Sequence, residues 1–356
     1  MLFSDELKSA VLQLNSQTPS PQWEDLALEI FQYQASQNQI YKEYLQHLGV
    51  SPTKIRRVDK IPCLPIQFFK EHTIVCQGIH PIHVFESSGT TGTQTSRHFI
   101  ADLAFYEALS LKIFEQFYGA LTDYHILALL PSYLERNNSS LVYMVQHFIS
   151  RSFSTASGFY LEERRALMHQ LRRLLEDTSS QSRKVILWGV TFALLDLLSE
   201  FPAEDWLIEN THRLILMETG GMKGRRKEMI REEVHQTLRT AWPVQSIHSE
   251  YGMTELLSQG YSLGDGWFHT PPSMRIYLRE INDPFHYLPR QRIGQETHAR
   301  RGKTGGINVI DLGNVDSCCF IETQDLGSYS PDYQQFQVLG RFDQSDIRGC
   351  NLLILH

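Results

Sequence analysis

Short apolar runs alternate with longer amphipathic segments from about residue 61 to 250, and this alternation constrains the fold more than any other feature of the chain. Four runs have the length of a β-strand, at residues 125–130, 185–190, 213–217 and 244–249. Between them, apolar residues recur at the spacing of a helix face. One such face holds Tyr106, Leu109, Ile113 and Phe117, and a second holds Ile230, Val234 and Leu238, and we expect both to be core. Strands that alternate with helices predict parallel α/β architecture.

The two ends of the chain show other patterns. In residues 1–60, Leu7, Val11 and Leu14 lie at helical spacing, which predicts helices. After about residue 260 the helical pattern stops and short β-rich segments follow, at 274–279, 306–311, 318–322, 336–339 and 351–355. Neither an internal repeat nor a low-complexity linker divides the sequence. We therefore expect one composite domain rather than two joined ones.

Composition excludes several classes of protein. With 40 acidic and 33 basic residues the formal charge is −7, and 42% of the 356 residues are hydrophobic, which disfavours disorder and a basic nucleic-acid-coating protein. Five cysteines without a Cys-x-x-Cys pair indicate neither a disulfide framework nor a zinc ribbon. The 15 histidines include the closely spaced His80 and His83, but no second pair of metal ligands stands near them in the sequence, so we predict no structural metal.

The amino-acid sequence shows no recognisable targeting signal. Asp5 and Glu6 stand where a signal peptide needs basic residues. The longest apolar stretch, residues 185–198, contains Asp196 and is shorter than the roughly 20 residues of a spanning helix. We expect a cytoplasmic protein with no membrane span.

The strongest local signal is a segment rich in hydroxyl side chains and glycine at residues 87–95. Its glycines let backbone N–H groups converge and its hydroxyls add donors, an arrangement that holds phosphate oxygens. It is not a Walker A loop, because no Gly-Lys-Ser/Thr closes it. A plain surface turn is the alternative. The candidate phosphate-binding residues are Ser87, Ser88, Gly89, Thr90, Thr91, Gly92 and Thr93.

A second segment, residues 249–255, follows the strand expected at 244–249. Ligands bind at the carboxyl ends of parallel strands, so Tyr251 and Gly252 are candidates for nucleotide contact. Thr254 can donate to a phosphate, and Glu255 can hold Mg²⁺ as metal ligand and catalytic residue. Taken without the other segments, Glu255 is instead a solvated carboxylate at a helix start.

Two later segments each have the composition of a simple turn. Residues 323–327 contain Asp325, and residues 340–349 begin Gly-Arg-Phe-Asp with Arg341. An Asp can accept both hydrogen bonds of a ribose diol, and a nearby Arg can reinforce it or neutralise phosphate charge.

Taken in order, the four segments resemble the motifs of the adenylate-forming superfamily, which includes acyl-CoA synthetases, firefly-type luciferases and nonribosomal adenylation domains. The resemblance covers about residues 60–350 and implies the N-terminal domain of that fold, with parallel α/β subdomains and a smaller β-rich one. It implies an adenylation domain at 1–340, its β-rich part at about 260–340, and a hinge motif with a short C-terminal segment at 341–356. Gly220 and Gly221 correspond to the adenine-pocket turn.

Within that superfamily the chain most resembles the LuxE-type acyl-protein synthetases, through residues 61–70, residues 130–136 and the ending Arg348-Gly349-Cys350. In that group a C-terminal cysteine carries the acyl chain, and Cys350 is the matching catalytic position. A purely structural, buried Cys350 is the alternative.

Two departures from the superfamily pattern stand out. Gln94-Thr95 replaces the usual Pro-Lys of the phosphate loop, so Arg97 or His98 would have to supply the missing cation. Few residues follow Gly349, so we expect the C-terminal lid with its catalytic lysine to be absent.

The resemblance implies ATP-dependent activation of a carboxylic acid, most simply a fatty acid, as acyl-adenylate, followed by acyl transfer to a thiol. ATP or AMP and Mg²⁺ are the expected cofactors, with the nucleotide between residues 87–95 and 251–255. The acceptor is CoA, a protein thiol or Cys350, and an acyl-donor or acyl-acceptor protein is a possible partner. A nucleotide-binding pseudo-enzyme, or a subunit of an acyl-transfer complex with little activity alone, remains the alternative.

Overall fold

The computed structural model describes residues 3–87, 94–131, 138–177, 179, 183–220, 229–288, 304–330 and 332–342. Its N-terminal part is helical, as expected, with α1 (Phe3–Gln13), α2 (Ser20–Gln37) and α3 (Gln39–His47). Asn38 ends α2 and caps α3, because its Oδ1 accepts from the Tyr41 N–H at 3.0 Å. The apolar faces bury Leu7, Trp23 and Phe31.

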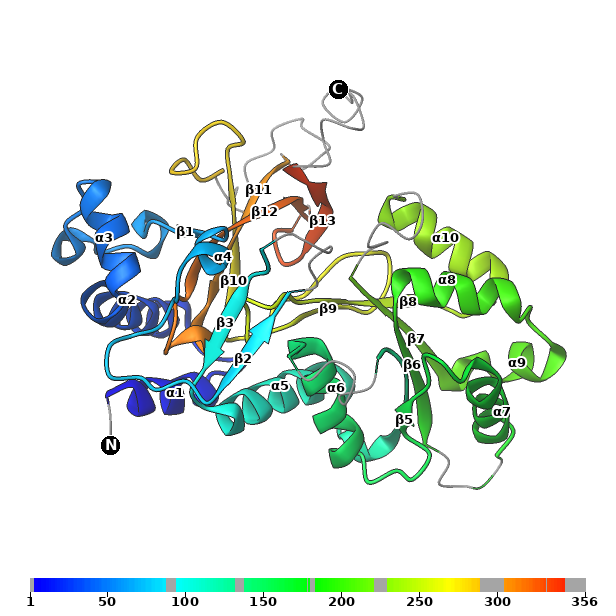
Figure 1. The fold of residues 1–356 in the computed structure, drawn as a ribbon. Coiled ribbons are helices and arrows are strands. Elements are labelled where there is room, and N and C mark those ends of the chain that lie inside the picture. Colours follow the sequence, from blue (N-terminus) through cyan, green and yellow to red (C-terminus); the bar gives the residue numbers. More distant parts are fainter. Residues whose placement is uncertain are drawn as a thin grey trace. The chain divides into compact units, whose positions relative to one another are not determined.

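One sheet gathers the β-rich C-terminal segments (Figure 1). Its order is β1-β12-β11-β10, and β13 pairs with β12. The strands are β1 (Leu64–Pro65), β10 (Met274–Arg279), β11 (Gly305–Asp311), β12 (Phe320–Tyr329) and β13 (Phe336–Arg341). Since β1 pairs parallel with β12, a segment near the N-terminus completes this C-terminal sheet.

The connection from the N-terminal helices into the chain's middle is made of short elements. They are η1 (Pro52–Lys54), η2 (Val58–Lys60), α4 (Phe68–Glu71), and the antiparallel hairpin of β2 (His83–Glu86) and β3 (Arg97–Ile100). The helix α5 (Leu103–Tyr118) follows. Its Tyr106, Leu109 and Ile113 are buried, as expected, whereas Phe117 near the end of the helix is only half-buried.

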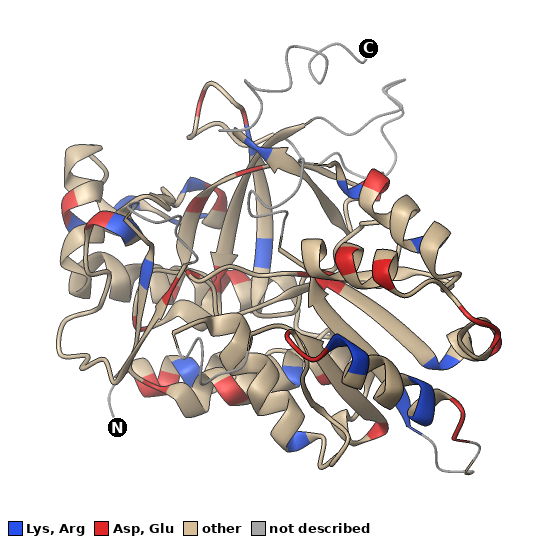
Figure 2. Ribbon diagram, turned by 45° about the vertical axis from the view of Figure 1, so that its right-hand side comes forward, with Lys and Arg blue, Asp and Glu red and all other residues tan. Residues whose placement is uncertain are grey.

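A second sheet has the order β5-β4-β6-β7-β8-β9. Pairs from β5 to β8 are parallel and β9 is antiparallel, so parallel α/β architecture is confirmed. The strands are β4 (Tyr124–Leu129), β5 (Gly158–Phe159), β6 (Lys184–Val190), β7 (Leu214–Thr219), β8 (Ile247–Tyr251) and β9 (Gly260–Ser262). Its strands carry the charged residues Lys184, Glu218 and Glu250 at or next to their ends. Most of the charged residues of the described chain lie on helices and loops (Figure 2).

Helices connect the parallel strands, as the sequence pattern requires. They are α6 (Ser140–Arg151), α7 (Arg164–Leu175), α8 (Thr191–Glu200), α9 (Asp205–Asn210) and α10 (Arg231–Ala241). The short helix η3 (Leu121–Asp123) leads from α5 into β4, and η4 (Thr211–Arg213) leads from α9 into β7. The helices α8 and α10 lie side by side (Figure 1). Val234 and Leu238 of α10 are buried, as expected, but the expectation for Ile230 is wrong: it precedes the helix as its N-cap residue and is exposed.

Two sequence expectations need correction. Residues 323–327 are not a turn: they lie within β12, and residues 325–327 pair with β13. The strand expected at 244–249 runs instead from Ile247 to Tyr251, so Tyr251 belongs to the strand rather than to the loop after it. The segment expected at 351–355 lies outside the described residues.

The described residues divide into two compact units. Unit 1 comprises residues 1–109, 254–258 and 269–356, and unit 2 comprises residues 110–253 and 259–268. No helix among the described residues is both long and apolar enough to cross a membrane.

Candidate functional site

The β2–β3 hairpin of unit 1 carries the hydroxyl-rich segment. Ser87 follows β2, and its N–H donates to the Ser96 carbonyl at 3.0 Å while its Oγ accepts from the Ser96 N–H at 2.9 Å. These two bonds close the neck from which the segment leaves the hairpin. Ser88, Gly89, Thr90, Thr91, Gly92 and Thr93 lie outside the described residues.

Glu255 lies in a buried turn directly after Thr254. Its residue is only 5% exposed, so the alternative of a solvated carboxylate at a helix start is wrong. Burial raises the pKa of Glu255, while a hydrogen bond from the Ser96 hydroxyl and the charge of Arg341 act to lower it. Asp325 adds a second negative charge nearby. The sequence-derived residues Thr254, Glu255, Asp325 and Arg341 are thus gathered in unit 1 with the neck of the hairpin.

His98 and Asn314 hold this turn through its backbone. The His98 Nδ1 lies 3.0 Å from the Thr254 carbonyl oxygen, which can only accept, so Nδ1 carries the proton. The other ring nitrogen, Nε2, then accepts from the Ser317 hydroxyl at 2.9 Å. The Asn314 side-chain amide donates to the Glu255 carbonyl at 2.7 Å. Two side chains therefore fix the backbone position of Thr254 and Glu255.

His98 does not replace the missing cation of the phosphate loop. It is 1% exposed, and burial lowers its pKa to about 4, so it is neutral near pH 7. Arg97, half-buried on the other face of β3, stays a candidate, with its guanidinium 5.6 Å from the centre of the Phe99 ring.

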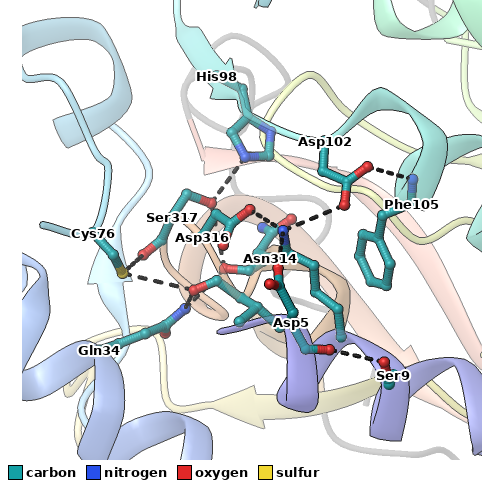
Figure 3. A network of polar contacts seen from close by, with 12 residues as sticks. Asp5, Ser9, Gln34, Cys76, His98, Asp102, Phe105, Asn314, Asp316 and Ser317 are labelled. Atoms are coloured by element: carbon teal, nitrogen blue, oxygen red, sulfur yellow. Dashed lines mark hydrogen bonds and ion pairs between the residues drawn. The ribbon is translucent and has the colours of Figure 1, made fainter. Parts of the chain in front are cut away.

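Behind His98 lies a polar network that the sequence analysis did not single out (Figure 3). The Lys8 ammonium of α1 lies 2.7 Å from Asp316 and 3.5 Å from Asp102. Burial would lower the pKa of Lys8, but its bonds to the two carboxylates outweigh burial and raise it. Asp316 neighbours Ser317, so the network ties α1 to the segment that holds His98. Nothing in the local pattern around Lys8 distinguishes it from a solvated helix residue.

Asp325 and Arg341 are paired across β12 and β13. The Asp325 N–H donates to the Thr323 hydroxyl at 3.1 Å, which orients the backbone ahead of the carboxylate. Arg341 donates to the Gln324 side chain at 2.8 Å and is exposed. Placing a carboxylate and a guanidinium on opposite residues of two strands suits recognition of a hydroxyl pair or a phosphate.

In unit 2, Gly220, Tyr251 and Gly252 lie at the carboxyl ends of β7 and β8. Gly220 adopts a left-handed conformation with φ 74°, which favours glycine. A Cβ at Gly252 would meet the Glu250 carboxylate, so a larger residue there would have to displace the end of that side chain. Gly221 lies outside the described residues, as does Cys350 of the chain's end.

The same strand ends bury two carboxylates that the sequence analysis missed. Glu218 accepts from the Thr191 hydroxyl at 2.9 Å and from Arg231 at 3.2 Å. Burial would raise its pKa, but Arg231 and His235 lower it to about 2. Glu250 accepts from the Thr219 hydroxyl, and burial raises its pKa to about 7.

Comparisons with known proteins complete the description. A family model described as acyl-protein synthetase, LuxE, matches residues 5–355. A search of curated proteins finds no match. A solved 2-hydroxyisobutyryl-CoA ligase, in a postadenylation state, is 12% identical with a TM-score of 0.62, covering 92% of this chain and 69% of that one. This likeness shows the fold of the N-terminal domain of adenylate-forming enzymes.

Two further solved structures match over less of their length. A long-chain-fatty-acid-CoA ligase from Archaeoglobus fulgidus is 13% identical with a TM-score of 0.47, covering 74% of this chain and 52% of that one. A fatty acid AMP ligase from Legionella pneumophila is 13% identical with a TM-score of 0.42, covering 74% of this chain and 50% of that one. The chain thus spans about half the length of these two proteins.

Proposed function

Because this chain belongs to the LuxE acyl-protein synthetase family and is an AMP-forming ligase, we propose that it activates a fatty acid with ATP and Mg²⁺ and passes the acyl group to a thiol. In the first step a carboxylate oxygen of the acid attacks the α-phosphorus of ATP, and pyrophosphate leaves with the electrons of the broken P–O bond. In the second step a thiolate attacks the acyl carbonyl, a thioester forms and AMP leaves.

The observation that carries this proposal is the buried Glu255 carboxylate beside Asp325, Arg341 and the neck of the β2–β3 hairpin. A carboxylate that is desolvated and has a raised pKa gains from a cation brought with the substrate. Mg²⁺ is commonly bound by one or two carboxylates plus substrate phosphates, and the residues present fit that demand. Glu255 would hold the ion, which would neutralise developing phosphate charge.

The other candidate residues take roles by position. Asp325 and Arg341 would bind the ribose, and Thr254 would donate to a phosphate. Ser87 through Thr93 would bind phosphate oxygens, and Gly220, Gly221, Tyr251 and Gly252 stay sequence-based candidates for nucleotide contact. Catalysis would come mainly from positioning the acid in line with the α-phosphorus.

The burial of the cysteines that the structure describes reduces the number of candidates for the acceptor thiol. Cys63, Cys76, Cys318 and Cys319 are all buried, and burial raises the pKa of each thiol, to about 12 for Cys63 and Cys76. Such thiols are poor nucleophiles at neutral pH. This favours Cys350, CoA or a partner's thiol as the acceptor.

Pyrophosphate exchange across a panel of carboxylic acids tests the activation step. We expect ATP formation from labelled pyrophosphate with long-chain acids and not without acid or Mg²⁺. A chain that binds AMP but exchanges no pyrophosphate with any acid is the pseudo-enzyme instead. Exchange that begins only on addition of a second protein identifies a subunit of a complex.

Labelling tests the acceptor separately. Incubation with ATP, Mg²⁺ and labelled fatty acid should give hydroxylamine-sensitive label on the wild type and none on Cys350→Ser. Omission of ATP is the control. Label that persists on Cys350→Ser rejects Cys350 and leaves adenylation standing.

A further inference from the structure

Arg279, the last residue of β10, is a buried cation that none of the sequence motifs contains. Its residue is 4% exposed. Its Nη1 donates to the Ile307 carbonyl at 2.9 Å and to the Asn308 side chain at 2.8 Å, and its Nη2 donates to the Thr323 carbonyl at 2.7 Å. The guanidinium therefore reaches from β10 over β11 to the backbone of β12.

Gly306 makes this path possible. It is the register partner of Arg279 in the β10–β11 pair, and a Cβ there would lie 2.5 Å from the guanidinium carbon. A larger residue at position 306 would occupy the space through which the Arg279 side chain passes. The path of the arginine therefore depends on the glycine.

Arg279 binds the backbone of β12 at the place where the regular hydrogen-bond pairing of β12 with β11 is interrupted. The register of β11 with β12 shifts between Gly306 and Asn308, and that of β12 with β13 shifts between Leu326 and Gly327. Such irregularities leave backbone groups that side chains must satisfy. Arg279 takes the Thr323 carbonyl, while the Thr323 hydroxyl donates to Ile307 at 2.7 Å and accepts from the Asp325 N–H.

Arg279 also meets the end of β13. Its guanidinium carbon lies 5.3 Å from the centre of the Phe342 ring, and Phe342 directly follows Arg341. In addition, its guanidinium forms an ion pair with Glu322 of β12 at 3.4 Å, and its charge acts favourably, though less strongly, on the Asp325 carboxylate. One side chain therefore contacts the segments that carry both candidate ribose residues.

We propose that Arg279 is a positioning residue for the nucleotide, which fixes the backbones of β12 and β13 so that Asp325 and Arg341 bind the ribose together. The inference rests on the proposed function and adds to it a residue outside the motifs. A planar guanidinium with two donors on different carbonyls suits this task, whereas a lysine ammonium cannot bridge the same set of acceptors.

A double-mutant cycle tests the proposal through the KM for ATP in pyrophosphate exchange. The variants are Arg279→Lys, Asp325→Ala and both together. Arg275→Lys is the matched control, since Arg275 lies on the same strand but contacts Glu24, Ser20 and Trp23 of α2. We expect Arg279→Lys to raise the KM about tenfold with little change in kcat, because it removes binding rather than chemistry.

The cycle separates positioning from general support of the fold. If Arg279 acts through Asp325, its replacement should change the KM by less than about twofold once Asp325 is already alanine. Penalties that multiply in the double variant overturn the proposal. An Arg279→Lys variant that keeps its KM but loses kcat and active fraction also overturns the proposal, because this is the result expected if Arg279 only supports the fold.

A second variant covers the case in which Arg279→Lys does not fold. Gly306→Ala displaces the guanidinium without removing it and should also raise the KM for ATP. Its control is Gly158→Ala, where the nearest atom to an added Cβ is an ordinary 3.5 Å away. A Gly306→Ala enzyme with an unchanged KM overturns the proposal.

Failure of the proposed function gives a different result. If the wild type exchanges no pyrophosphate, calorimetry of AMP binding on the same variants replaces the KM. AMP affinity lost in Asp325→Ala and in Arg279→Lys then supports the positioning role without catalysis. A wild type that binds neither ATP nor AMP overturns both ideas, and affinity lost only in Asp325→Ala overturns the role of Arg279 alone.

Discussion

Glu255, Glu250 and Glu218 are all buried carboxyl groups, yet their neighbours shift their pKa values in different directions. Arg231 and His235 lower the pKa of Glu218 to about 2, so it stays ionised. Burial raises the pKa of Glu250 to about 7, and the nearby charge of Glu218 acts in the same direction. The hydrogen bond that Glu250 accepts from the Thr219 hydroxyl acts to lower its pKa. Burial also raises the pKa of Glu255, and the Ser96 hydroxyl donates a hydrogen bond to its carboxylate. Of the three, Glu255 is the one that the sequence motif associates with Mg²⁺.

Replacing Glu255 by Gln should reduce pyrophosphate exchange by at least about tenfold, because the amide keeps the shape but loses the charge that binds Mg²⁺. Stability near pH 7 should not fall, since a buried ionised carboxylate with a raised pKa is a cost to the folded state. Glu29→Gln, an exposed site on α2, is the control. Exchange at the parent rate would show that Glu255 binds no metal.

Glu250→Gln should alter how stability depends on pH. The folded-state pKa of about 7 exceeds the ordinary 4.5, so the folded chain keeps a proton that the unfolded chain loses. Stability of the wild type therefore falls as pH rises from about 4.5 to 7, by about 2 kcal/mol for this group. Denaturant unfolding at pH 5 and 7.5 should show this fall reduced in Glu250→Gln, but retained in Glu209→Gln, an exposed site on α9. An identical pH slope in the wild type and Glu250→Gln contradicts the prediction.

At the scale of elements, the candidate site depends on segments that are distant in sequence. The β2–β3 hairpin, the Thr254–Glu255 turn and η5 (Leu312–Asn314) are joined by His98 and Asn314. The helix α1 is joined to the same region through Lys8 and Asp316. The helix therefore supports the turn without contributing a residue to the chemistry.

Lys8→Met should destabilise the chain by about 3 kcal/mol, because it leaves Asp316 buried without its cation. The control is Arg57→Met, which breaks an exposed ion pair with Asp59 and should cost less than about 1 kcal/mol. Urea unfolding followed by the fluorescence of the five tryptophans, of which Trp23 lies in unit 1, measures the difference. Equal losses in the two variants would show that the α1 network contributes no more than a surface pair.

At the scale of the whole molecule, the proposed binding residues are distributed unevenly. Glu255, Asp325 and Arg341 all belong to unit 1, although residues 254–258 reach it from a chain segment flanked on both sides by unit 2. Any ligand that binds these residues stabilises the folded form of unit 1 by mass action.

AMP at about 100 times its Kd should raise the free energy of unfolding by about 2.7 kcal/mol and the Tm by a few degrees. The gain should disappear in Asp325→Ala at the same AMP concentration. Asp25→Ala, an exposed residue of α2, should keep it. A thermal shift equal in all three proteins would contradict binding of the ribose by Asp325.

The sequence by itself determined the elements whose signal is local. Hydrophobic periodicity located the parallel strands around Ile126, Ile186 and Leu216 and the buried face of α10, because burial on one side leaves a regular trace in the chain. The motif order also singled out Glu255, Asp325 and Arg341 as candidate site residues, through resemblance and not through periodicity.

Only the tertiary structure decided which distant groups meet. The pairing of β1 with β12, the neutral tautomer of His98, the tie from Lys8 to Asp316 and the path of Arg279 over Gly306 all join segments far apart in sequence or depend on such a contact. Residues 323–327 have turn composition, yet they belong to a strand, because β11 pairs with residues 326 and 327 and β13 pairs with residues 325–327. A polar side chain carries no local record of its burial, since burial and partner are set by packing of the whole chain.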